Sequence, residues 1–227
     1  MNAPARSLLA AALLAAAAGC GPRSGGLGTA AFAGFEARCE NLPAARFEVV
    51  TAPVEVREDY SLAYVELEKL ADASAPRHRT VGLTQAKFGY RSTLEFEGIE
   101  DPRSGRVCAR ARVRVEVTTA PMTVFVAREY RGDPCREPII IEHERRHVAV
   151  FETYAAEWAE RLASELNAKV GGAIRYAPTM ADAQTALKTE IAAHLEAFMD
   201  RARSDLAERH ARIDTRYEYE KLVRVCG

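Results

Sequence analysis

The stretch Ile139–Phe151 (IIIEHERRHVAVF) constrains this chain most, because it combines a helical pattern with two histidines four residues apart. Residues four apart lie on one face of a helix, so His143 and His147 can each point an imidazole nitrogen at the same metal ion. Glu144 lies about 100° round the helix from His143, where its carboxylate can take a proton from a water on the ion. The His-Glu-x-x-His spacing therefore predicts half of a zinc site, with Glu144 as the catalytic base.

The surrounding residues favour a long helix that carries this motif. Apolar and aromatic side chains continue the line of the two histidines at spacings of three or four, through Phe151, Tyr154, Trp158 and Leu162. We predict a helix over residues 137–169, stopped by Gly171-Gly172. The alternative is that the two histidines pack or hydrogen-bond at a helix–helix interface, with Glu144 an ordinary surface charge.

The beginning of the chain is typical of an exported protein. Residues 1–20 contain Arg6, an apolar run over residues 8–18, and Ala17-Ala18-Gly19-Cys20 as a small-residue cleavage region. The last four residues resemble a bacterial lipoprotein signal, which implies cleavage before Cys20 and a lipid on its thiol. Ala17 stands where leucine is more usual, and ordinary secretion after Ala18 is the alternative. Residues 21–34 are glycine-rich and predict a flexible tether, followed by one domain over residues 35–227.

Charge and cysteine content narrow the class of protein. The chain has 31 basic and 32 acidic residues, so composition gives no indication of nucleic-acid binding. Besides Cys20 there are four cysteines, an even number that predicts two disulfides in an oxidising compartment. Three pairings are possible, and we favour Cys108 with Cys135 across a hairpin and Cys39 with Cys226. A zinc site built from these thiols is the rival interpretation, although no Cys-x-x-Cys spacing supports it.

The pattern of the remaining chain predicts an α+β domain. The clearest strand is 107–117, which alternates valine and alanine with arginine, and we assign its arginine row to a solvated sheet face rather than to an anion-binding surface. Short connections predict an antiparallel sheet of about four strands packed with a long antiparallel helical hairpin that carries the motif. The further elements expected are an extended stretch over 46–57 interrupted by Pro53, a short helix over 61–72, extended structure over 80–97, a strand over 122–130 and a second long helix over 180–219.

The third metal ligand is sought on this second helix, because catalytic zinc usually has three protein ligands and one open position. If the hairpin folds about residue 174 or 175, the numbers of two residues that face each other add up to about 349. His143 then faces residue 206, and His147 faces residue 202. Asp205 falls in this window and is the ligand that geometry favours. A small stagger would select Glu208 instead, and Asp205 pointing outward into water is the alternative.

The order of these elements resembles that of a bacterial family of putative secreted zinc-dependent proteases, over roughly residues 80–220. The resemblance rests on a cysteine-bearing strand, a return strand, the histidine motif on a long helix, and a second helix ending in Tyr217-Glu218-Tyr219-Glu220. In that family the second helix ends in Tyr-Asp-x-Glu-Thr followed by His-Gly, whereas Val223 and Arg224 occupy the corresponding region here. If that histidine is the family's third ligand, then Glu218, Glu220 or Asp205 must replace it, or the site is degenerate. Arg145 and Arg146 also depart from the uncharged pair common inside such motifs.

These observations predict a cell-envelope zinc metallohydrolase, a peptidase acting on a peptide or protein substrate. The strand 122–127, if it lies at a sheet edge, could align an extended peptide by strand addition. The second hypothesis is a non-catalytic envelope lipoprotein that binds a protein or cell-wall partner and keeps the motif for packing or for a structural metal. The pattern specifies neither the substrate nor the oligomeric state.

Overall fold

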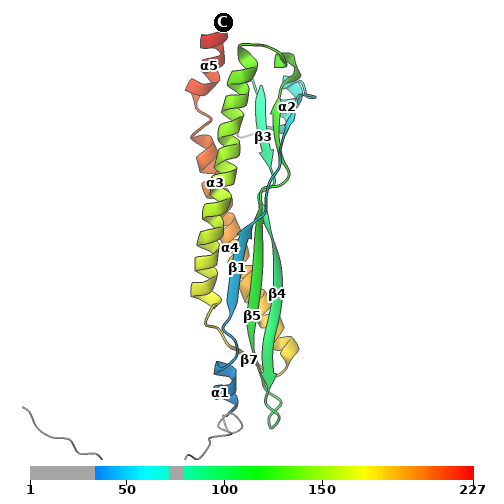
Figure 1. Cartoon of the computed structure of the whole chain (residues 1–227), viewed down its shortest axis with the longest axis vertical. Coiled ribbons are helices and arrows are strands. Elements are labelled where there is room, and N and C mark those ends of the chain that lie inside the picture. Colours follow the sequence, from blue (N-terminus) through cyan, green and yellow to red (C-terminus); the bar gives the residue numbers. More distant parts are fainter. Residues whose placement is uncertain (1–33, 72–78) are drawn as a thin grey trace, which may run out of the picture. The chain divides into compact units, whose positions relative to one another are not determined.

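Helix α3 (Arg136–Val170) lies against both β-sheets of the fold (Figure 1). The computed structural model describes residues 34–71 and 79–227, and residues 35–227 form one compact unit. The predicted signal peptide, Cys20 and residues 21–33 of the predicted tether lie outside the described residues. The described part is an α+β fold, as predicted.

The sequence of α3 accounts for its position in the core. The helix begins where Asp133 Oδ1 accepts hydrogen bonds from the backbone N–H groups of Cys135 and Arg136, which satisfies two of the free donors at a helix start. It ends at Gly171-Gly172, as predicted. Along its length the aromatic and leucine positions at spacings of three and four are buried, including Tyr154, Trp158 and Leu162.

The strands form two mixed sheets, so the prediction of one antiparallel sheet was wrong. In the first, β5 (Val107–Thr118) lies between β1 (Arg46–Thr51), which is parallel to it, and β4 (Gly89–Glu100), which is antiparallel; β7 (Arg175–Ala177) also pairs with β5. In the second, β6 (Met122–Val126) lies between the parallel β2 (Val56–Asp59) and the antiparallel β3 (Gly82–Ala86).

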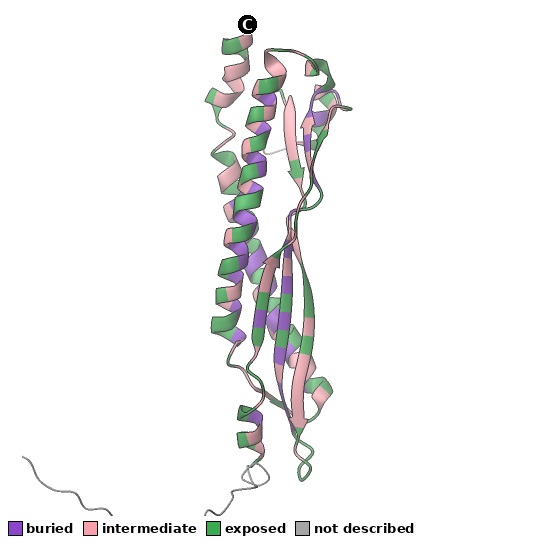
Figure 2. Cartoon of the chain, in the orientation of Figure 1, coloured by how far each residue is buried: buried purple, intermediate pink, exposed green. Residues whose placement is uncertain are grey.

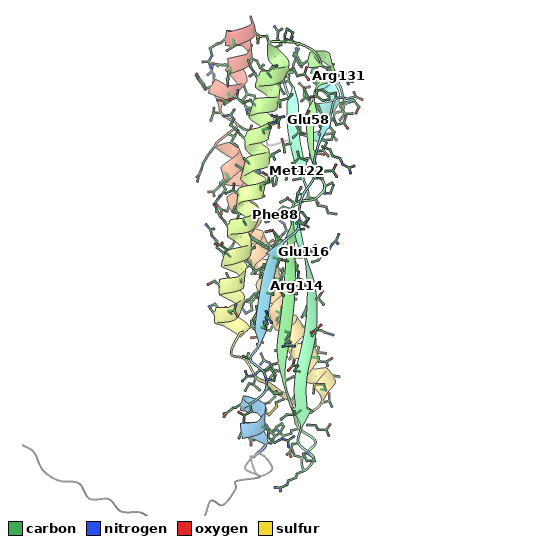
Figure 3. The ribbon with its side chains drawn as sticks, viewed as in Figure 1. Glu58, Phe88, Arg114, Glu116, Met122 and Arg131 are labelled. Atoms are coloured by element: carbon green, nitrogen blue, oxygen red, sulfur yellow. A yellow bond between two sulfur atoms is a disulfide. The ribbon has the colours of Figure 1, made fainter. Side chains whose placement is uncertain are left out.

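The strands of the two sheets lie in the same order. Along the chain β1 is followed by β2, β5 by β6 and β3 by β4, and the two members of each pair occupy equivalent positions in the two sheets. The segment around Pro53, which lacks a backbone N–H, separates β1 from β2. Residues 119–121 separate β5 from β6, and residues 87–88 separate β3 from β4. Phe88 lies at this last break, where its ring packs against Tyr154 and Trp158 of α3 (Figure 3).

Strand β5 has the predicted buried and exposed faces. Its valines at 113, 115 and 117 are buried, and the residues between them are more exposed (Figure 2). On the outer face Arg112 contacts Glu97 and Arg114 contacts Glu48. These ion pairs are typical of a solvated sheet face that carries both signs of charge.

The second long helical pattern divides into two helices, α4 (Met180–Ala211) and α5 (Arg216–Cys226), so the single helix predicted over 180–219 was wrong. Helix α4 packs antiparallel to α3, as two contacts show. Tyr154 Oη donates to the Ala202 carbonyl, and one turn later on α3 the ring of Trp158 packs on Phe198, one turn earlier on α4. The remaining elements are α1 (Phe35–Glu40), α2 (Tyr64–Leu70) and the 3-10 turn η2 (Arg128–Tyr130). No helix in the described part of the chain has the length and apolar character needed to cross a membrane.

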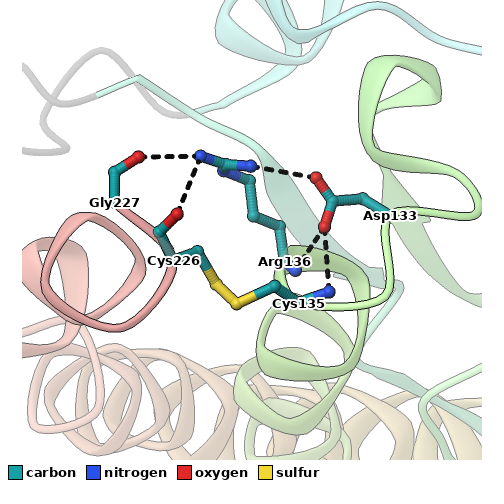
Figure 4. Close-up of a disulfide and its surroundings, with 5 residues drawn as sticks. All are labelled: Asp133, Cys135, Arg136, Cys226 and Gly227. Carbon is teal, nitrogen blue, oxygen red and sulfur yellow. Dashed lines mark hydrogen bonds and ion pairs between the residues drawn. A yellow bond between two sulfur atoms is a disulfide. The ribbon is translucent and has the colours of Figure 1, made fainter.

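The four cysteines form two disulfides, as predicted, but the favoured pairing was wrong. Cys39 of α1 bonds to Cys108 of β5, and Cys135 at the start of α3 bonds to Cys226 at the end of α5 (Figure 4). Proximity across the hairpin does not decide the partner of Cys108, because α1 brings Cys39 beside β5. The bonds close loops of 69 and 91 residues, which corresponds to about 4–5 kcal/mol each on the loop-entropy estimate.

The Cys135–Cys226 bond is reinforced by Arg136, whose guanidinium joins Asp133 to the carbonyl oxygens of Cys226 and Gly227 (Figure 4). Helix α5 has no buried residue. Its attachment therefore depends on this disulfide, on the Arg136 bonds and on side-chain contacts with α3.

We predict that a mild dithiol reductant opens Cys135–Cys226 before Cys39–Cys108. Cys39 and Cys108 are both 0% exposed, whereas Cys135 and Cys226 are partly exposed, and thiol–disulfide exchange requires access to a sulfur atom. Timed reduction, alkylation and peptide mass mapping would measure the order. Alkylation of Cys39 or Cys108 first would contradict it.

Candidate metal centre

His143 and His147 lie on the face of helix α3 that packs against the end of α4. His147 is 7% exposed, and His143 is half-buried one turn before it. Their Nε2 atoms lie 3.2 Å apart. The i, i+4 spacing therefore brings the two nitrogens to one point, as predicted.

A third group at this point is Asp214, from the turn between α4 and α5. Its Oδ1 lies 3.1 Å from His143 Nε2 and 3.2 Å from His147 Nε2. In a tetrahedral zinc site with bonds of 2.0–2.1 Å, neighbouring ligand atoms are about 3.3–3.4 Å apart. The three atoms are thus close to the separations that one ion requires, and the cluster could hold a metal ion.

The predicted third ligand, Asp205, is not brought to this cluster. Asp205 instead forms ion pairs with Arg161 of α3 and with Arg209 of its own helix. The contacts Tyr154–Ala202 and Arg161–Asp205 give facing positions that add up to 356 and 366, not the 349 expected. The connection, residues 171–179, is centred on residue 175 as assumed, but α4 is staggered along α3, so the two histidines face the end of α4 and the turn after it.

The other acidic residues considered also lie outside the cluster of three. Glu208 is exposed, and Glu220 bonds to Arg216. Glu218 is nearest, with Oε2 3.7 Å from His143 Nδ1, and forms an ion pair with Arg146. Glu218 therefore lies behind the imidazole of His143, not beside its Nε2.

Glu144 is buried beside the cluster, under strand β3. It is 4% exposed, and its Oε2 accepts a hydrogen bond of 2.8 Å from Thr84 Oγ1. Gly82 permits this approach, because a Cβ there would lie 2.5 Å from Glu144 Oε1. Burial raises the pKa of Glu144, although His147 and Thr84 act in the opposite direction.

The surrounding residues shape the charge of the cluster. Burial alone would raise the pKa of Asp214, but hydrogen bonds from His143 and His147 hold that pKa below its ordinary value. Burial and then the charge of Asp214 raise the pKa of Tyr219 to about 12. Burial, followed by the charge of His147, lowers the pKa of His210 to about 4. The centre is therefore a desolvated group of histidines around one carboxylate.

Sequence reasoning missed Asp214 and His210, which contacts His147. A signal was present in the apolar line of the second helix, where buried Ala202 and Leu206 are followed at the same spacing by His210 and Asp214. The spacing identifies the face of the helix. The spacing does not identify the facing residues of α3, because these depend on how far α4 is staggered along α3.

The cluster opens into a cavity of about 620 Å³ between α3, β3 and α5. Its apolar lining includes Val81, Leu83, Ile139, Phe151 and Leu222. Such a cavity, apolar with a few converging polar groups, is typical of a small-molecule or substrate site.

Comparisons of the chain with protein-family models, with curated proteins and with solved structures find no match. The resemblance to secreted zinc-dependent proteases therefore stays a prediction. The function has to be argued from the geometry of the centre itself.

We predict that Asp214→Asn weakens Zn²⁺ binding by more than the 10- to 100-fold that is typical of an outer-shell partner, because a ligand oxygen loses its charge. Competition with a chromogenic chelator would measure the affinity. Asp205→Asn is the matched control, since it makes the same chemical change at a surface ion pair. Undiminished affinity in Asp214→Asn would remove Asp214 from the centre.

Proposed function

We propose that this protein is a zinc-dependent hydrolase that cleaves peptide bonds. The observation that carries the proposal is the convergence of His143 Nε2, His147 Nε2 and Asp214 Oδ1 beside the buried carboxylate of Glu144. Two imidazoles and one carboxylate are a donor set that suits catalytic zinc. When bound, the ion would polarise a carbonyl group and acidify a water molecule.

Glu144 is the proposed general base. Its Oε2 is held by Thr84, and Gly82 places no side chain over Oε1. One carboxylate oxygen is thus fixed by the protein while the other faces a backbone without a Cβ. Glu144 would take a proton from the attacking water at Oε1 and pass it to the leaving nitrogen.

Strand β3, not β6, is the proposed strand for aligning an extended peptide. Strand β6 pairs with β2 on one side and β3 on the other, so residues 122–127 do not meet the condition of lying at a sheet edge. Among the described residues β3 pairs with β6 alone. The Val81 carbonyl accepts from the Ala127 N–H, so by antiparallel alternation Gly82 and Thr84 direct their backbone groups to the free edge. A peptide added there would pass beside Glu144.

A non-catalytic, partner-binding protein is the second candidate, and Arg146 is the observation that favours it. Its Nη2 lies 3.1 Å from His143 Nδ1. Arginine can only donate, so neutral His143 would carry its proton on Nε2, toward Asp214. Such a cluster is satisfied by hydrogen bonds without an ion. Metal analysis of protein purified without added zinc separates the two candidates, because the hydrolase should hold one zinc per chain.

We also propose that the protein acts in the bacterial cell envelope, anchored through a lipid on Cys20. The two disulfides support an oxidising compartment. Metabolic labelling with a fatty-acid analogue should mark the wild type and leave Cys20→Ser unlabelled. Equal labelling of both proteins would contradict the anchor.

We predict that Glu144→Gln keeps bound zinc and loses hydrolysis by about 10²- to 10⁴-fold, because the amide retains the shape of the carboxylate but is not a base. Cleavage of a mixed library of unstructured peptides, followed by mass spectrometry, would provide the rate. His143→Ala is the control that should lose both zinc and activity. Equal cleavage by the wild type and Glu144→Gln would exclude Glu144 as the base.

A further inference from the structure

His210 lies directly behind the candidate metal centre, on the last turn of α4. Its Nδ1 is 2.8 Å from Nδ1 of His147, on the opposite side of that imidazole from Asp214. The ring of Phe151 packs against His210 at 4.4 Å between centroids. His210 is therefore held by α3 on both sides, at His147 and one turn later at Phe151.

The direction of the His147–His210 hydrogen bond depends on whether an ion occupies the cluster. Because Arg146 donates to His143 Nδ1, neutral His143 carries its hydrogen on Nε2. Without an ion, the Nε2–H groups of His143 and His147 can both donate to Asp214 Oδ1, at 3.1 and 3.2 Å. On the proposed function an ion would take the Nε2 lone pair of His147, so His147 would carry its hydrogen on Nδ1 and donate it to His210 Nδ1.

This assignment leaves the hydrogen of His210 on Nε2, and that atom is buried without a hydrogen-bond partner. Buried donors in folded proteins almost always have partners, so an unpartnered one requires an explanation. An apolar side chain at this position would remove the unsatisfied group. A histidine at this position supplies a hydrogen-bond acceptor at Nδ1, which an apolar side chain does not.

We propose that His210 is a positioning residue, which accepts the Nδ1–H of His147 when an ion is bound and thereby holds the Nε2 lone pair of His147 toward the ion's position between His143 and Asp214. The inference deepens the proposed function, on which its consequence for metal binding rests. An outer-shell acceptor of this kind fixes the tautomer and the orientation of a metal-binding imidazole. No role in contact with substrate is assigned to His210, because its free nitrogen is buried.

Two variants separate an acceptor from a space-filling side chain. In His210→Asn the amide oxygen occupies the position of Nδ1 and can accept the same hydrogen bond, whereas His210→Leu places a methyl group there. His194→Asn, on α4 but four turns earlier, is the control for removing a histidine from this helix. Circular dichroism would establish that all three variants are folded.

The first measurement is the tautomer of His210 in the zinc-loaded protein, by long-range ¹H–¹⁵N correlation spectra. We expect the hydrogen of His210 on Nε2 in the wild type and in His194→Asn, which leaves Nδ1 as the acceptor for His147. A hydrogen on Nδ1 of His210 in the zinc-loaded wild type would overturn the proposal.

The second measurement is Zn²⁺ affinity, by competition with a chelator. We expect His210→Leu to bind about 10- to 100-fold more weakly than the wild type, with His210→Asn restored toward the wild-type value. Equal weakening in both variants would mean that His210 acts through packing, and would overturn the proposal. Absence of zinc binding in the wild type would contradict the proposed function, whereas zinc binding of equal strength in the wild type and His210→Leu would contradict this inference alone.

Discussion

The packing of α4 on α3 is the interaction on which the rest of the centre depends. The buried Tyr154–Ala202 hydrogen bond and the Trp158–Phe198 ring contact fix how far one helix is displaced along the other. That displacement brings the end of α4 and the turn after it to the histidine motif. A shift of one helical turn is about 5.4 Å, more than a ligand bond allows, so the packing of the hairpin core decides whether three ligands meet.

The elements predicted correctly from the sequence are those in which the spacing of apolar residues follows one buried face. Helix α3 and strand β5 were located nearly to their ends, because the periods of 3.6 and 2 are direct consequences of one buried face. Strand pairing was a different matter. Alternation in 46–57 shows that a strand has two faces but not which strand it joins, so the parallel pairing of β1 and β2 was missed. The predicted disulfide pairing was wrong for the same reason, because the partner of Cys108 lies on α1.

The residues of the candidate metal centre also fall into a group that local spacing predicts and a group that it does not. His143, Glu144 and His147 were found because their chemistry and their spacing belong to one helix. Asp214 and Thr84 reach the centre from other elements, and an error of several residues in the assumed stagger of α4 along α3 was enough to choose Asp205 instead. Local spacing therefore predicts the part of a site that lies on one element. The remaining ligands require the tertiary packing, and the Arg146–His143 contact shows that neighbouring residues can also alter how a familiar motif is hydrogen-bonded.

The separation of these parts along the chain has a consequence for the order of events during folding. Thr84 and Glu144 are 60 residues apart, and His143 and Asp214 are 71 apart. Contacts between distant segments form late, because closing the intervening loops reduces chain entropy before the contacts compensate for it. In a nascent or partly folded chain, His143 and His147 would lie close together on α3 before Asp214 joins them. On the proposed function, the metal would then bind only after the whole domain is assembled. An enzyme that degrades peptides would stay inactive until its own fold is complete.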